Sequence, residues 1–142
     1  MLIFVSESCV DSAELALKAD AALGLMDKPL IGDIRKTEKG APYCNNYKIS
    51  ITHTDGKILL AVSSLPVGVD MEREDREVPK SMHDVKNWTA YEALCKMSGE
   101  GIRLSEVKSG ADHTNDVRFL YFLKDYVIAL AGEDEDVFVI CV

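Results

Sequence analysis

The stretch Gly56-Lys57-Ile58-Leu59-Leu60-Ala61-Val62 begins at an Asp55-Gly56 turn signal and predicts a strand that is apolar on both faces. A similar stretch, Lys124-Asp125-Tyr126-Val127-Ile128-Ala129-Leu130, begins 68 positions later and also follows a strand-like run. One helix is expected before each hairpin, over residues 12–25 and 88–98. This repeated order predicts a weak internal duplication.

The remaining segments place helices and strands in both halves of the chain. Further strands are expected over residues 1–5, 47–52, 65–70, 118–123 and 137–142, whereas residues 27–46 carry turn residues typical of loops and short strands. The pattern predicts an α+β protein with an N-terminal half, residues 1–67, and a C-terminal half, residues 68–142.

Composition narrows the class of protein. The chain has 142 residues, 47% of them apolar and 28% charged, which is typical of a soluble protein with one core. A net charge of −8 and a pI near 4.8 argue against nucleic acid and anionic membranes as partners. The four cysteines form no CxxC pair, which favours free thiols in a reducing cytoplasm. The apolar start is too short for a secretion signal.

Gly68-Val69-Asp70-Met71-Glu72 contains the first candidate site. In an extended strand, Asp70 and Glu72 lie on one face, while Val69 and Met71 point toward the core. Two neighbouring carboxylates repel unless a cation or a proton intervenes, and Mg²⁺ prefers such oxygen ligands together with phosphates. The alternative is an acidic strand end in solvent.

Two further segments carry candidate residues. Glu92 and Lys96 stand four apart on one face of the expected helix, a spacing that also fits an ordinary surface ion pair. Thr52-His53-Thr54 places a histidine between two hydroxyls at a strand end, where a lone histidine is also compatible with a structural role.

The order and spacing of these segments resemble the 4′-phosphopantetheinyl transferases, in particular the compact surfactin-activating (Sfp-like) type. The resemblance covers roughly residues 32–105, and its matching pieces are Ile51-Thr52-His53-Thr54, Val67-Gly68-Val69-Asp70-Met71-Glu72, and Trp88-Thr89-x-x-Glu92-Ala93-x-x-Lys96-x-x-Gly99-x-Gly101, together with Gly40-x-Pro42 upstream.

The resemblance implies a fold, an activity and a set of site residues. The fold would be two similar α+β halves packed as a pseudo-dimer, with coenzyme A in the cleft between them. The enzyme would move 4′-phosphopantetheine from coenzyme A to a serine of an acyl or peptidyl carrier protein and release 3′,5′-ADP. The implied Mg²⁺ ligands are Asp70, Glu72 and Glu92; the implied catalytic residues are Glu92, which takes the serine proton, and Lys96; the implied coenzyme A contacts are Thr52, His53, Lys96, Arg35 and Lys39.

Three positions depart from the family pattern. Lysines of the family are replaced by Ala41, Tyr91 and Glu100, and a phenol does not supply the charge of an ammonium group at neutral pH. These departures motivate a second hypothesis, a degenerate relative that binds coenzyme A or a carrier protein without transfer. A third is an α+β interaction protein with an accidental match. Because a duplicated chain contains both sides of the cleft, a monomer is expected.

Overall fold

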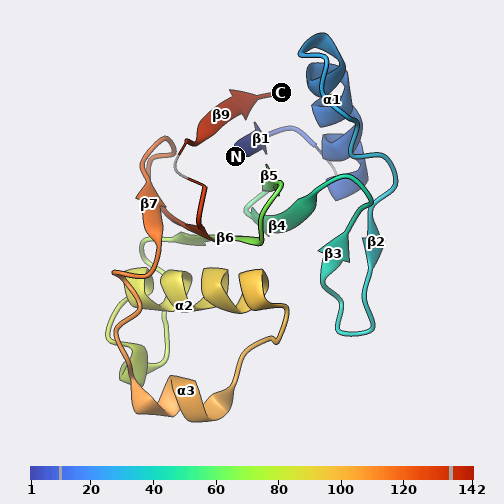
Figure 1. The fold of residues 1–142 in the computed structure, drawn as a ribbon. Helices are drawn as coiled ribbons and strands as arrows, with labels where there is room; N and C mark the ends of the chain where they lie inside the picture. The colour runs from blue at the N-terminus through green and yellow to red at the C-terminus, as the bar shows by residue number, and fades with distance from the viewer. Residues whose placement is uncertain (10, 135) are drawn as a thin grey trace.

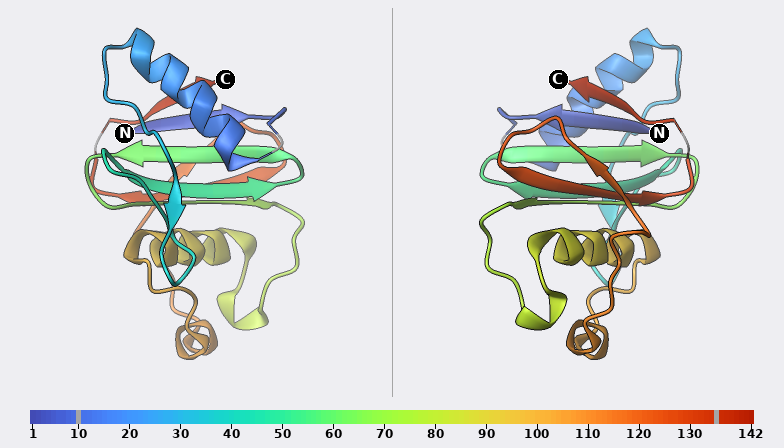
Figure 2. Two further views of the ribbon diagram at one scale, coloured as in Figure 1. Left: turned by 90° about the vertical axis from the view of Figure 1, so that its right-hand side faces the viewer. Right: turned by 90° about the vertical axis from the view of Figure 1, so that its left-hand side faces the viewer.

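Two β-sheets pack face to face at the centre of the protein, and helices cover their outer faces. The computed structural model describes residues 1–9, 11–134 and 136–142. Its elements are β1 (Leu2–Ser6), α1 (Ser12–Leu25), β2 (Arg35–Lys36), β3 (Pro42–Tyr43), β4 (Lys48–Thr54), β5 (Lys57–Ser63), β6 (Val67–Arg73), the 3₁₀ turn η1 (Lys80–Met82), α2 (Val85–Ser98), α3 (Leu104–Ser109), β7 (Arg118–Leu120), β8 (Tyr126–Gly132) and β9 (Phe138–Cys141). Helices α1 and α2 lie on opposite sides of the sheets, and α3 lies beyond α2 (Figures 1 and 2). The predicted α+β class is confirmed.

Alternation along the strands separates the core into layers. On β1, Phe4 packs with Leu15 and Leu23 of α1, whereas Ile3 and Val5 pack with residues of the second sheet. The same division holds along β5, as the period of two of a strand requires. Strand β5 therefore buries both faces, as the apolar run over residues 58–62 predicted.

The two sheets share a connection order. The first is ordered β4-β5-β1-β9 and the second β6-β8-β7. In each, the opening strand pairs antiparallel with the second strand of a hairpin, β1 with β5 and β6 with β8. A helix, α1 or α2, lies between the opening strand and the hairpin in the chain. This connectivity agrees with the strand–helix–hairpin repeat expected from the sequence. Strand β9 departs from it, because it extends the first sheet parallel to β1.

Hydroxyl groups join the two sheets where β4 runs beside β6. Ser50 Oγ accepts from Val69 N at 2.9 Å, and Thr52 Oγ1 accepts from Met71 N at 3.3 Å. Thr54 Oγ1 donates to Met71 O at 2.9 Å. These bonds fix the position of β6, and hence of its two acidic residues, relative to the Thr52-His53-Thr54 segment.

The sequence predictions differ from the structure in several places. Strand β6 extends to Arg73 and not to residue 70, and β7 ends at Leu120 and not at residue 123. Helix α2 begins at Val85 and not at residue 88, because the Asp84 side chain accepts from Asn87 N at 2.8 Å and caps the helix. Helix α3 was not expected, and η1 lies in a segment described only as polar.

Two further observations concern the helices and the cysteines. None of the helices in the described residues has the length and apolar character needed to cross a membrane. All four cysteines are free thiols, three buried and Cys141 exposed.

Candidate active site

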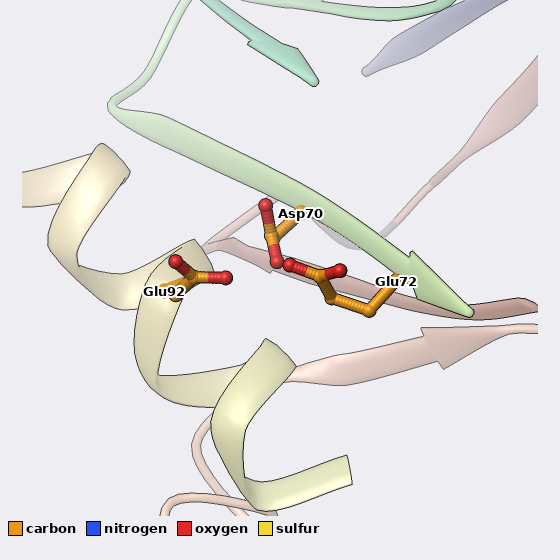
Figure 3. Close-up of side chains that lie close together, drawn as sticks. All are labelled: Asp70, Glu72 and Glu92. Atoms are coloured by element: carbon orange, nitrogen blue, oxygen red, sulfur yellow. The ribbon is translucent and has the colours of Figure 1, made fainter. Parts of the chain in front are cut away.

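Three carboxylates meet between β6 and α2. Asp70 and Glu72 extend from β6 toward α2, and Glu92 extends from α2 toward them (Figure 3). One oxygen from each can be chosen so that all lie within 4.8 Å of one another. Asp70 and Glu72 are only 4% and 6% exposed, so the alternative of an acidic strand end in solvent is wrong. The alternation of β6 was predicted correctly, because Val69 and Met71 lie in the core between the sheets.

A glycine lets helix and strand come this close. A Cβ atom built at Gly68 would lie 1.9 Å from Ala93 O and 2.6 Å from Met97 N, both backbone atoms of α2. The backbones therefore touch where residue 68 has no side chain. Because Glu92 directly precedes Ala93, and Asp70 lies two residues after Gly68 on the same strand face, the contact brings these two carboxyl groups together.

Two cations bind the cluster from different elements. Lys96 Nζ on α2 donates to Asp70 Oδ1 at 2.7 Å and to Ile51 O at 3.3 Å. Arg76, in the segment after β6, donates from Nη1 to Glu72 Oε1. Lys96 thus reaches across to β6, and the alternative of a surface Glu92–Lys96 pair does not describe its contact.

Two oxygens of the cluster have no partner. Asp70 Oδ2 and Glu92 Oε2 are buried without a hydrogen bond, and a buried polar atom without a partner costs free energy. Three oxygen donors, two of them unpartnered, suit a hard divalent cation such as Mg²⁺. A metal ion bound there would satisfy both atoms, so the residues present fit the metal that the sequence implied.

Burial and neighbouring charge hold a proton on Glu92 when no metal is bound. Desolvation raises the pKa of Glu92 most, and the negative charge of Asp70 raises it further, from 4.5 to about 9. The raised pKa favours the protonated form of Glu92 beside Asp70 when no metal is bound. A metal ion that takes Glu92 as a ligand has to displace this proton.

The shift predicts how stability changes with pH. Between 4.5 and about 9 the folded protein retains a proton on Glu92 that the unfolded chain has lost, so the free energy of unfolding falls as pH rises. Urea unfolding in EDTA at pH 6 and pH 8.5 is expected to show this loss in the wild type and a much smaller one in Glu92→Gln. An equal loss in both proteins would contradict the assignment of the proton to Glu92.

A cleft opens beside the carboxylates. A cavity of about 590 Å³ is lined by all three acidic residues together with Thr52, His53 and Lys96. Thr52 Oγ1 also donates to Asp70 Oδ1 at 3.3 Å. The structure thus brings six of the eight site residues predicted from the sequence to one cleft.

A smaller, more apolar cavity adjoins the cleft. It measures about 290 Å³, and its lining includes Glu92, Lys96 and the seventh predicted residue, Lys39, near the tip of the β2–β3 hairpin. The eighth, Arg35, is not part of either lining. Its guanidinium lies 4.9 Å from the centre of the Tyr43 ring and donates to Asn45 Oδ1. The neighbouring Lys36 lines the larger cleft instead.

The three departures from the family pattern have different surroundings. Tyr91 is buried on the side of α2 that faces α3, where its hydroxyl donates to Glu106 Oε2 at 2.9 Å and accepts from Arg103 N at 2.8 Å. Ala41 lines the apolar cavity, and Glu100 forms an exposed ion pair with Arg103. Tyr91 therefore anchors the segment before α3, a role that a lysine at this buried position would fill poorly.

Arg76 was not predicted as a site residue from the sequence. The one indication in the sequence is that Arg76 lies four residues after Glu72, in a segment without regularly spaced apolar residues.

Comparison with known proteins adds no relative. No family model matches the sequence, and the search of curated proteins gave no significant match.

Proposed function

We propose that the protein transfers the 4′-phosphopantetheine arm of coenzyme A to a serine of an acyl or peptidyl carrier protein. The observation that carries the proposal is the buried meeting of Asp70, Glu72 and Glu92 at a cleft, with two carboxylate oxygens unpartnered. The motif resemblance named these three residues as ligands of Mg²⁺. Two similar halves packed as a pseudo-dimer form the proposed frame of this cleft.

The carboxylates would hold Mg²⁺ and the cations would meet the phosphates. A bound Mg²⁺ supplies positive charge to the pyrophosphate oxygens, on which negative charge grows as the bond to the leaving group breaks. Lys96 lines both cavities and already binds an anionic oxygen of Asp70, so a phosphate oxygen suits the same ammonium group. Thr52 and His53 line the same cleft and would donate to phosphate.

The transfer needs a group that removes a proton. The serine hydroxyl oxygen attacks the phosphorus that carries the pantetheine arm, the pyrophosphate bond breaks, and 3′,5′-ADP departs. In its carboxylate form, Glu92 would accept the serine proton directly or through water. A bound metal ion would favour the carboxylate form of this residue by its positive charge.

The cleft offers two lysines to acidic molecules despite the negative net charge of −8. Lys36 lines the larger cavity and Lys39 the smaller one, both from the β2–β3 hairpin. A local positive edge of this kind favours an approach by coenzyme A and by an acidic carrier protein. The four free thiols support a place in the reducing cytoplasm.

The experiment is intact mass spectrometry of a panel of apo carrier proteins incubated with the protein, coenzyme A and Mg²⁺. The expected result is a mass gain of one phosphopantetheine arm on at least one carrier. The gain should disappear with EDTA and with Glu92→Ala.

Other results would lead away from the transferase. A thermal shift with coenzyme A and Mg²⁺ but no mass gain on any carrier would favour the degenerate binder. Neither a shift nor a gain would contradict the proposal and leave an interaction protein.

A further inference from the structure

Arg76 reaches the carboxylate cluster from outside the cleft. Its side chain is 44% exposed, whereas the Glu72 side chain that it binds is 8% exposed. Glu72 lines the larger cavity, but Arg76 does not. The guanidinium therefore approaches Glu72 from the more exposed side, close enough to Glu92 and Asp70 for their charges to raise the pKa of Arg76 as well.

The chain after β6 fixes the position of Arg76. A turn returns Arg76 N to Arg73 O at 3.1 Å, and Glu74 N donates to Asp125 O at 3.0 Å, beside the second hairpin. These bonds place residue 76 next to the strand face that carries Glu72. The hydrogen bond to Glu72 raises the pKa of Arg76, which is charged throughout the ordinary pH range in any case.

Lys96 and Arg76 are expected to respond differently when a ligand binds in the cleft. Lys96 lines the cleft, so a bound phosphate would compete with Asp70 for its ammonium group. Arg76 is not among the residues that line the cleft, so its bond to Glu72 is compatible with a ligand there. It occupies Oε1 and leaves Oε2 for another partner.

We propose that Arg76 is a positioning residue of the metal site, which holds Glu72 by one carboxylate oxygen and leaves the other free for a divalent cation. Hydrogen-bond partners behind metal ligands fix ligand orientation, and their loss lowers metal affinity by about 10–100-fold. The inference rests on the metal site of the proposed function and is independent of phosphopantetheine transfer.

The opposite expectation follows from charge alone. Removing a cation near three carboxylates strengthens their attraction for Mn²⁺ or Mg²⁺. If Arg76 acted only through its charge, Arg76→Gln would therefore bind the metal more tightly than the wild type. The matched control is Arg73, which is also an exposed arginine close to the cluster in sequence. It pairs with Asp75 and Asp55.

The test is calorimetric titration of EDTA-treated, dialysed protein with MnCl₂, without coenzyme A. Arg76→Gln is expected to weaken Mn²⁺ binding by about 10-fold or more, Arg76→Lys to recover part of the loss, and Arg73→Gln to bind Mn²⁺ no more weakly than the wild type. Urea unfolding in EDTA checks that each variant is folded.

Three results would overturn the inference. Unchanged or tighter Mn²⁺ binding by Arg76→Gln would show that Arg76 does not position Glu72. An equal loss in Arg73→Gln would show that the effect does not depend on the contact between Arg76 and Glu72. If the wild type bound no Mn²⁺, the proposed metal site itself would be wrong. Unchanged Mn²⁺ affinity in Arg76→Gln, together with a mass gain on a carrier protein by the wild type, would reject the inference and leave the proposed function standing.

Discussion

Replacing Asp70 by asparagine is expected to abolish Mg²⁺-dependent transfer, with a loss of at least about 10²-fold in rate. Asp70 accepts the Lys96 and Thr52 hydrogen bonds through one oxygen and has its other oxygen buried and unpartnered. An amide keeps the shape but removes the charge that attracts a dication. The measurements are the rate of carrier modification by mass spectrometry and the thermal shift with Mg²⁺.

Asp125→Asn serves as the control, because it replaces a carboxylate by an amide in the same way at another position. Asp125 is exposed in the turn before β8 and has φ of 66°, a conformation that asparagine adopts readily. This variant is expected to retain activity and metal response. Transfer by Asp70→Asn near the wild-type rate would contradict the role of Asp70 as a metal ligand.

Gly68→Ala is expected to cause the largest loss of stability. The added methyl group would overlap backbone atoms of α2, with 1.9 Å to Ala93 O, and a helix backbone cannot rotate away as a side chain can. Overpacking costs about 1–3 kcal/mol and occasionally more, and we expect the upper part of this range because the obstacle is backbone. Urea unfolding measures the free energy directly.

The same substitution elsewhere in the chain should have the opposite sign. Gly24 is a residue of α1, and a Cβ there would meet nothing within 4 Å. Gly24→Ala is therefore expected to stabilise the protein by about 0.5–1 kcal/mol. A Gly68→Ala variant as stable as the wild type would show that α2 can move away from β6. Such a movement should then appear as weaker metal binding, because Glu92 would move with the helix.

Part of the site follows from short-range patterns. Alternation along residues 68–72 was enough to place Asp70 and Glu72 on one face and Val69 and Met71 in the core. The motif resemblance added Glu92 and Lys96 from the helix. The faces of a strand can be predicted from the sequence because the alternation repeats within a few residues.

Other parts depend on contacts between distant segments. The parallel pairing of β9 with β1 joins the two ends of the chain. A local sequence pattern does not indicate which strand pairs with which. Helix α3 has only six residues and one buried side chain, Val107, so it carries almost no periodic signal. Arg76 lies in a segment without repeating apolar residues, and its role depends on a turn that the structure alone reveals.

Strand β9 also has a consequence for how the protein melts. The chain leaves the second sheet after β8 and returns to pair with β1 in the first sheet. Neither sheet can come apart alone without losing the β1–β9 ladder or the hydroxyl bonds between β4 and β6. The two sheets are thereby joined into one cooperative unit, and heating should give a single transition instead of two.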